Sequence, residues 1–153
     1  MQLTDLIPVE RIGCNIDANS KKRALEKLGD LLSTGETKIT NTEVFDSLIN
    51  RERLGGTGIG HGVAIPHGRV QSCSTTLGAF IKLAQPVDFD AMDNQPVDLL
   101  FALIVPEHST EQHLQILAKI ATMFNDKDMR IKLRQAETSE DLQKLIQKWQ
   151  QTN

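Results

Sequence analysis

His67 stands directly after a glycine-rich stretch, and its surroundings fit a nucleophile. Imidazole titrates near neutral pH, so an uncharged His67 can attack an electrophile. Residues 55–62 hold five of the chain's ten glycines, and clustered backbone amides can form a nest for an anion such as a phosphoryl group. Pro66 and Gly68 on either side predict a side chain held on a tight turn. An ordinary surface loop with an incidental histidine stays open, because the glycines match neither the Walker nor the dinucleotide-binding pattern.

Two further residues could assist His67. His113 lies on the same helical stripe as Leu117, Ile120 and Phe124, in the first turn of a helix that follows a strand end. There it can hydrogen-bond a phosphoryl oxygen, with favourable partial charge from the helix N-terminus, or it is a satisfied core histidine. Arg51 precedes the glycine stretch, and a guanidinium matches the geometry of phosphate oxygens. An ion pair of Arg51 with a neighbouring acid is the competing interpretation.

Other arginine and histidine positions carry less weight. Arg69 has the same two interpretations as Arg51, and we expect it to face solvent or a partner protein. The histidines at positions 61, 67, 108 and 113 lack the i, i+4 spacing of a helical zinc pair, so we expect no metal. There is no GxSxG motif, which argues against a serine hydrolase.

Capping residues and apolar spacing predict the elements that position these side chains. One helix is expected to begin after the N-cap Ser20 and to run through Leu32. Two more are expected to begin at capping boxes, one of Thr40 with Glu43 and one of Ser109 with Gln112, and a last helix is expected from Thr138 onward. A short helical stretch is expected at 129–134. Strands are expected at 76–83 and at the apolar run 97–105, which suits a strand covered on both faces. Residues 63–66 are expected to be extended and interrupted at Pro66, and the glycine stretch to form no regular element.

Together these elements predict an α/β fold: a single domain over residues 1–153, with a mixed β-sheet flanked by helices on both faces. The net charge is −3 and the pI about 5.8, which argues against binding to nucleic acid or an anionic membrane. No apolar run approaches the roughly 20 residues that span a bilayer, and no signal peptide is visible. We therefore expect a cytoplasmic chain, with Cys14 and Cys73 as reduced thiols.

The motifs around these residues identify a family resemblance. Residues 57–68 (TGIGHGVAIPHG) resemble the active-site signature of the IIA components of the fructose–mannitol class of the bacterial phosphotransferase system. Residues 89–103 (FDAMDNQPVDLLFAL), 20–25 and 51–55 are similar to its nitrogen-regulatory branch. The resemblance runs from about Leu3 to Leu145. His61 departs from it, because Asn or another small polar residue is expected there; we hypothesise that His61 makes phosphorylation more sensitive to pH.

The resemblance implies the fold, the site and the partners. His67 would accept a phosphoryl group from an HPr-like phosphocarrier (NPr), with phosphoenolpyruvate as the ultimate donor and no cofactor. His113 and Arg51 would stabilise the phosphoryl group, and the loop residues Thr57, Gly58, Gly60 and Gly62 would bind it. Because the chain ends at Asn153 without a second domain, we expect a regulator whose targets include potassium-transport or sensor-kinase systems. A sugar-uptake IIA that passes the group to a separate IIB, and a binding module that is never phosphorylated, remain alternatives.

Overall fold

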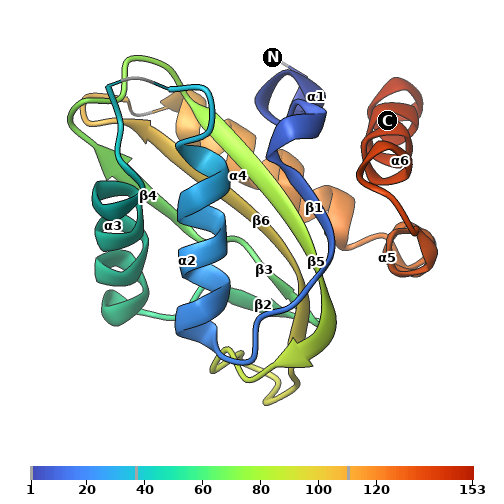
Figure 1. Ribbon diagram of the computed structural model, residues 1–153. Helices are drawn as coiled ribbons and strands as arrows, with labels where there is room; N and C mark the ends of the chain where they lie inside the picture. Colours follow the sequence, from blue (N-terminus) through green and yellow to red (C-terminus); the bar gives the residue numbers. More distant parts are fainter. Residues whose placement is uncertain (1, 37, 110) are drawn as a thin grey trace.

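The computed structural model describes residues 2–36, 38–109 and 111–153, and Figure 1 shows the arrangement of its elements. The helices are α1 (Leu3–Leu6), α2 (Lys21–Leu32), α3 (Asn41–Leu54), α4 (Glu111–Phe124), α5 (Lys127–Gln135) and α6 (Ser139–Thr152), with a 3₁₀ turn at Val9–Arg11. The strands are β1 (Ile12–Ile16), β2 (Gly58–Gly60), β3 (Val63–Ala64), β4 (His67–Val70), β5 (Leu77–Val87) and β6 (Val97–Pro106).

Local capping bonds explain where the helices begin. The hydroxyl of Ser20 accepts a hydrogen bond from the amide of Arg23 at the start of α2. Thr40 and Glu43 form both bonds of a capping box at the start of α3, and Thr138 caps α6. These side chains satisfy amides that have no partner inside the helix. The predicted helix starts are therefore confirmed, except that the capping box of Ser109 and Gln112 spans Thr110, which lies outside the described residues.

The strands form one mixed sheet in the order β1-β5-β6-β3-β2, and β4 also pairs with β6. β6 lies antiparallel to β5 and parallel to β3 and β4, which follow one another along the same side of β6. The pairing breaks at Ile65–Pro66, as the missing proline donor predicts, and His67 resumes it opposite Leu103. β4 therefore lies at an edge of the sheet.

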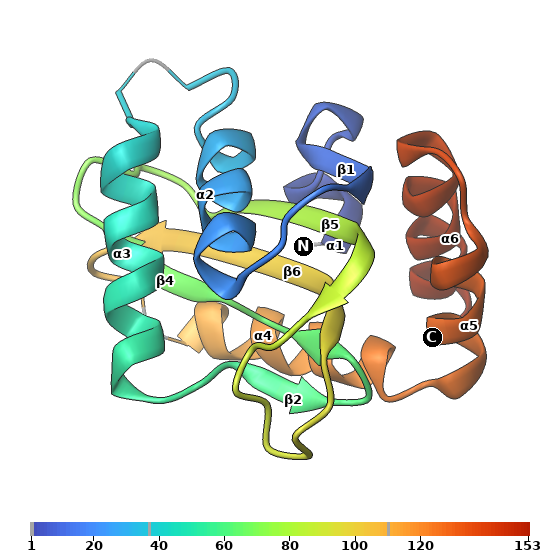
Figure 2. The ribbon, with the colours of Figure 1, turned by 60° about the horizontal axis from the view of Figure 1, so that its bottom comes forward.

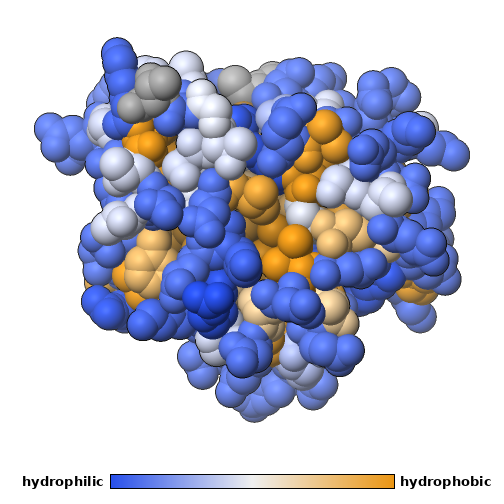
Figure 3. Space-filling view, viewed as in Figure 1, coloured by the Kyte–Doolittle hydropathy of each residue, from blue (hydrophilic) through white to orange (hydrophobic). Residues whose placement is uncertain are grey.

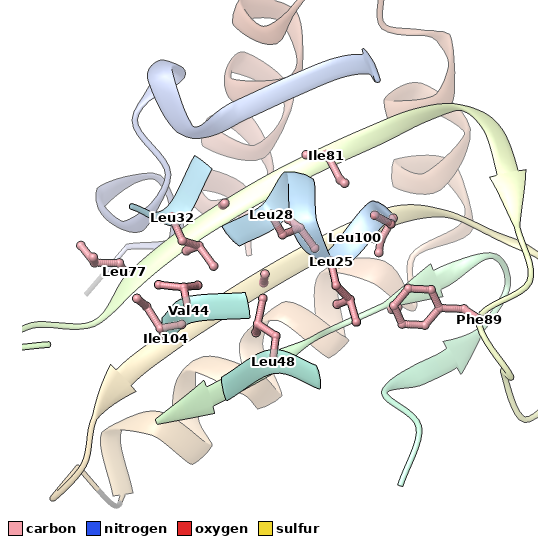
Figure 4. Close-up of a cluster of buried hydrophobic side chains, with 14 of the residues drawn as sticks. Leu25, Leu28, Leu32, Val44, Leu48, Leu77, Ile81, Phe89, Leu100 and Ile104 are labelled. Atoms are coloured by element: carbon pink, nitrogen blue, oxygen red, sulfur yellow. The ribbon is translucent and has the colours of Figure 1, made fainter. Parts of the chain in front are cut away.

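Helices cover both faces of this sheet, which confirms the predicted fold class. Figure 2 shows α4 on the face opposite to α2 and α3. Alternate residues of β6 pack into the two apolar layers, as the pleat of a strand requires. Leu100 and Ile104 lie in the layer with Leu25 and Leu28 of α2 and Leu48 of α3 (Figure 4). Phe101 and Leu103 pack in the other layer against α4 and α6.

The β-sheet differs from the sequence expectations in four places. His67 was expected on a tight turn, but residues 67–70 form β4, which pairs in parallel with β6. The glycine stretch is not irregular throughout, because Gly58–Gly60 forms β2 and pairs antiparallel with β3. β1 was not predicted at all; it is a strand because it pairs in parallel with β5. β5 also continues to Val87, four residues beyond the predicted end. In each case pairing with a neighbouring strand sets the structure.

The surface over α2 and α3 is mostly hydrophilic, and hydrophobic atoms show mainly in the gap between α2 and β1 (Figure 3). Across the described ranges, no helix combines the length and apolar character needed to cross a membrane. Cys14 and Cys73 are both free thiols, as predicted.

Candidate active site

A pocket of about 580 Å³ opens at the edge strand β4. Because β4 is at the edge of the sheet, α3 from one face and α4 from the other border the same space. The lining side chains and backbone come from Ser47, Asn50, Arg51 and Leu54 of α3, His67, Gly68 and Arg69 of β4, and His113 of α4. The fold thus brings together His67, His113 and Arg51, which are distant in the sequence.

The ring of His67 is held by its own chain. Its Nδ1 lies 2.8 Å from the carbonyl oxygen of Ile65, and because a carbonyl only accepts, Nδ1 must carry the proton. Nε2 is then unprotonated in the neutral ring and has no hydrogen-bond partner among the described residues. His67 therefore presents a free lone pair at Nε2, which is what a nucleophile requires.

Burial lowers the pKa of His67 below its usual value, because it removes water from the charged form. The hydrogen bond to Ile65 acts in the opposite direction. The charge of Arg51 lowers the pKa further and the carboxylate of Glu52 raises it. The net effect keeps His67 neutral, and so nucleophilic, at physiological pH.

His113 faces His67 across the pocket. The two ring centroids are 5.5 Å apart and the rings are tilted by 53°. His113 is only 8% exposed, as its place on the inward stripe predicted. Its Nδ1 is buried and finds no partner in the described part of the chain. Burial first, then the nearby His67 and Arg69, lowers the pKa of His113. A buried ring without a polar partner argues against the satisfied core histidine.

Arg51 lies in the last turn of α3, where its Nη1 donates a 2.7 Å hydrogen bond to the carbonyl of Gly55. This bond caps the helix and holds the side chain beside the pocket. A guanidinium has five N–H donors, so most of them stay available for an anion. The competing ion pair of Arg51 with an acid is absent from the described residues, where the neighbouring Glu52 pairs with Lys21 instead.

Gly68 lets α3 approach the strand. A Cβ at this position would stand 3.1 Å from the backbone oxygen of Ser47 and would also clash with its hydroxyl. Ser47 in turn donates a 2.8 Å hydrogen bond to the carbonyl of Arg69. Gly68 was predicted to lie in a tight turn. It lies within β4 instead, where its lack of a side chain allows the close approach of Ser47.

The four predicted loop residues do not line the pocket. Thr57 is buried, and both its amide and its hydroxyl donate to the carboxylate of Glu52. Glu52 is 6% exposed and also pairs with the ammonium of Lys21 at 2.9 Å. Thr57 therefore belongs to a buried polar cluster below the end of α3.

The glycines shape the β2–β3 hairpin, whose tip lies near Asp93 and Arg134 and not at the pocket. Gly58 packs against Ala91, Gly60 lies near Asp93, and Gly62 has φ of +77° with the guanidinium of Arg134 beside it. His61 occupies the tip with φ of +59°, a conformation that Asn tolerates well. This backbone demand explains the expected Asn. His61 does not line the pocket, and its effect on the pH dependence of phosphorylation stays a prediction.

Arg69 is a pocket residue that sequence reasoning placed at the surface. It is exposed, but its Nη1 also donates to the carbonyls of Glu107, at 2.9 Å, and Ser109. Its position two residues after His67 on one strand put it on the same face, which was the available signal. The described residues contain no cluster of three or more His, Cys, Asp or Glu side chains placed to hold a metal ion.

Residues 5–149 match the family described as "Phosphoenolpyruvate-dependent sugar phosphotransferase system, EIIA 2". A nitrogen regulatory protein of Pseudomonas aeruginosa is 42% identical over 146 residues, which cover 95% of each chain. A fructose-specific EIIA component of Haloferax volcanii is 35% identical over 149 residues, 95% of this chain and 97% of the relative.

A solved structure supports the same relationship. The nitrogen regulatory protein IIA-Ntr from Neisseria meningitidis superposes with a TM-score of 0.88 and 40% identity, covering 93% of this chain and 97% of that one. The fold, the family match and these identities agree with the resemblance seen in the active-site motif. The chain is therefore a member of the EIIA 2 family of the phosphotransferase system, and its similarity is to the nitrogen-regulatory branch.

Proposed function

We propose that His67 accepts a phosphoryl group on Nε2 from the phosphohistidine of an HPr-like carrier (NPr). The observation that carries this proposal is the hydrogen bond from Nδ1 of His67 to the carbonyl of Ile65. It leaves Nε2 as the free ring nitrogen, in a pocket lined by two arginines and a second histidine. Phosphoryl transfer needs chiefly positioning and positive charge, and this pocket supplies both from the protein.

In the proposed step the lone pair of Nε2 attacks phosphorus in line with the carrier's phosphorus–nitrogen bond. That bond breaks, its electron pair stays on the carrier's imidazole, and the carrier's ring takes up a proton from solvent. The ring of His67 becomes positively charged as the new bond forms, and the carbonyl of Ile65 stabilises this charge through the Nδ1 proton. Arg51 and His113 stabilise the phosphoryl oxygens, and no cofactor takes part.

The phosphorylation state would then determine which target proteins the chain binds in the cytoplasm. Its similarity to nitrogen regulatory proteins supports this regulatory role, and potassium-transport and sensor-kinase systems are candidate targets. The similarity to a fructose-specific EIIA component supports a second candidate, onward transfer to a separate IIB protein. A regulator accumulates as phosphoprotein when a IIB is added, whereas a sugar-uptake IIA is rapidly discharged.

The test is incubation with phosphoenolpyruvate, enzyme I and the charged carrier, followed by intact mass measurement. The wild type is expected to gain one acid-labile phosphoryl group, and His67→Ala none. His61→Asn removes a histidine outside the pocket and should be labelled like the wild type. If a demonstrably charged carrier leaves the wild type unlabelled, the chain is a binding module and the proposal fails.

A further inference from the structure

Arg69 joins two segments that border the pocket. From β4, its guanidinium donates hydrogen bonds to the carbonyls of Glu107 and Ser109, with Pro106 at 3.5 Å. Pro106 ends β6, and Glu107 and Ser109 lie between β6 and α4. The Nη1 of one side chain thus binds backbone carbonyls of the short segment that leads to α4 and His113.

Hydrogen bonds on two sides hold the backbone of Arg69 in place. The carbonyl of Arg69 itself accepts a 2.8 Å hydrogen bond from Ser47 of α3, and residues 67–70 pair in register with β6. The backbone of Arg69 is therefore fixed from two sides. Its side chain extends from the strand to residues 107–109, which belong to a turn closed by a 3.1 Å hydrogen bond from the amide of Ser109 to the carbonyl of Pro106.

His113 depends on this connection for its position. No described residue donates to or accepts from its ring, and its Nδ1 is buried without a partner. The ring is therefore oriented by the placement of the first turn of α4 and by packing, not by a hydrogen bond of its own. Whatever fixes the approach to α4 also fixes the distance between His113 and His67, now 5.5 Å between centroids.

We infer that Arg69 is a positioning residue for the phosphoryl-transfer step, which holds the β6–α4 connection so that His113 faces His67. This inference rests on the proposed function. Arg69 acts through His113, because its Nη1 donates to the carbonyls of Glu107 and Ser109 in the segment that leads to α4, whereas the Nη1 of Arg51 donates to the carbonyl of Gly55 at the end of its own helix.

A double-mutant cycle tests this inference. Transfer from the charged carrier is measured for the wild type, Arg69→Gln, His113→Ala and the double variant. Arg69→Gln should lower kcat by roughly 10-fold with KM nearly unchanged, and the double variant should be no slower than His113→Ala alone. Multiplied effects would mean that Arg69 contacts the phosphoryl group itself, and a rise in KM alone would mean that it binds the carrier; either result overturns the inference.

Controls separate positioning from folding and from charge. Arg23→Gln removes an exposed arginine whose side chain pairs with Glu26, and it should leave kcat unchanged. Arg69→Lys keeps the charge, but its ammonium ends one bond short of the position of Nη1, so it should not restore the wild-type rate. Thermal unfolding reports whether each variant is folded; should Arg69→Gln unfold, Arg69→Lys carries the cycle in its place.

A spectroscopic measurement is independent of phosphorylation. In NMR spectra of the unphosphorylated chain, Arg69→Gln should shift the ring signals of His113, and Arg23→Gln should not. An unshifted His113 would contradict the inference even if labelling succeeds. If the wild type is never labelled but His113 shifts, the proposed function fails while the positioning contact stands.

Discussion

The Nδ1–H of His67 donates a 2.8 Å hydrogen bond to the carbonyl of Ile65, two residues earlier in the chain. Pro66 stands between them, where the ladder with β6 is interrupted, and the carbonyl of Ile65 points to the ring. This single contact selects the tautomer and orients the ring. It makes Nε2 the nitrogen that can react, and it connects the local sequence Ile-Pro-His to the chemistry proposed for the pocket.

Replacement of His113 tests its supporting role. Because a charge-assisted hydrogen bond to a phosphoryl oxygen contributes about 1.5–3 kcal/mol, His113→Ala should slow transfer by about 10- to 150-fold without abolishing it. Rapid-quench labelling with charged carrier measures the rate. Gln115→Ala, an exposed change on the same helix, serves as the control. A loss as complete as that of His67→Ala would contradict a supporting role.

Addition of a methyl group at Gly68 should separate α3 from β4. The new Cβ would meet the backbone of Ser47, so we expect Gly68→Ala to lower the free energy of unfolding by about 1–3 kcal/mol and to slow labelling as Arg51 moves away. Urea denaturation gives the stability. Gly55→Ala is the matched control, because no atom lies within 4 Å of its Cβ. Equal stability of the two variants would refute the packing argument.

Acidification should destabilise the folded chain through its pocket histidines. The pKa values of His67 and His113 are both lowered by burial, so the unfolded chain binds more protons. The stabilisation is complete above the ordinary value of about 6.5 and is lost as the pH falls through the folded values. Denaturation at several pH values should show a shallower decline for His67→Gln and His113→Gln than for wild type or His61→Gln. Parallel curves for all four proteins would contradict this assignment.

Replacement of Thr57 tests whether its loop binds the phosphoryl group or only stabilises the fold. Thr57→Val removes the hydroxyl that donates to the buried carboxylate of Glu52, and it should cost about 1–3 kcal/mol of stability. Its labelling rate at a temperature where it is folded should match the wild type. The exposed Thr42→Val gives the baseline for such a change. A strongly reduced labelling rate with unchanged stability would show that Thr57 takes part in binding the phosphoryl group.

Predictions from the sequence succeeded where the cause is local. Ser20, Thr40 and Thr138 cap helices through residues three positions away, so the pattern is visible in the chain. The apolar run 97–105 similarly shows that both faces of its strand are covered. The inward position of His113 followed from its helical spacing.

Predictions from the sequence failed where a residue's structure depends on a partner that is distant in the chain. β1 contains Gly13 and an Asn15 with φ of +53°, and it becomes a strand only through pairing with β5. β2 is likewise ordered by β3 despite its glycines. The carbonyl contacts of Arg69 and the pairing of Glu52 with Lys21 join residues that no sequence spacing relates. The predicted loop residues lie outside the pocket of His67, and their role in binding the phosphoryl group stays a prediction.

The most direct test of the account is the identity of the phosphorylated nitrogen. The chain is labelled with ¹⁵N at histidine, charged through the carrier, and studied by ¹⁵N and ³¹P NMR. We predict one phosphoryl group on Nε2 of His67, with Nδ1 still protonated and bound to the carbonyl of Ile65. Phosphorylation of Nδ1, or of any residue other than His67, would contradict the central claim.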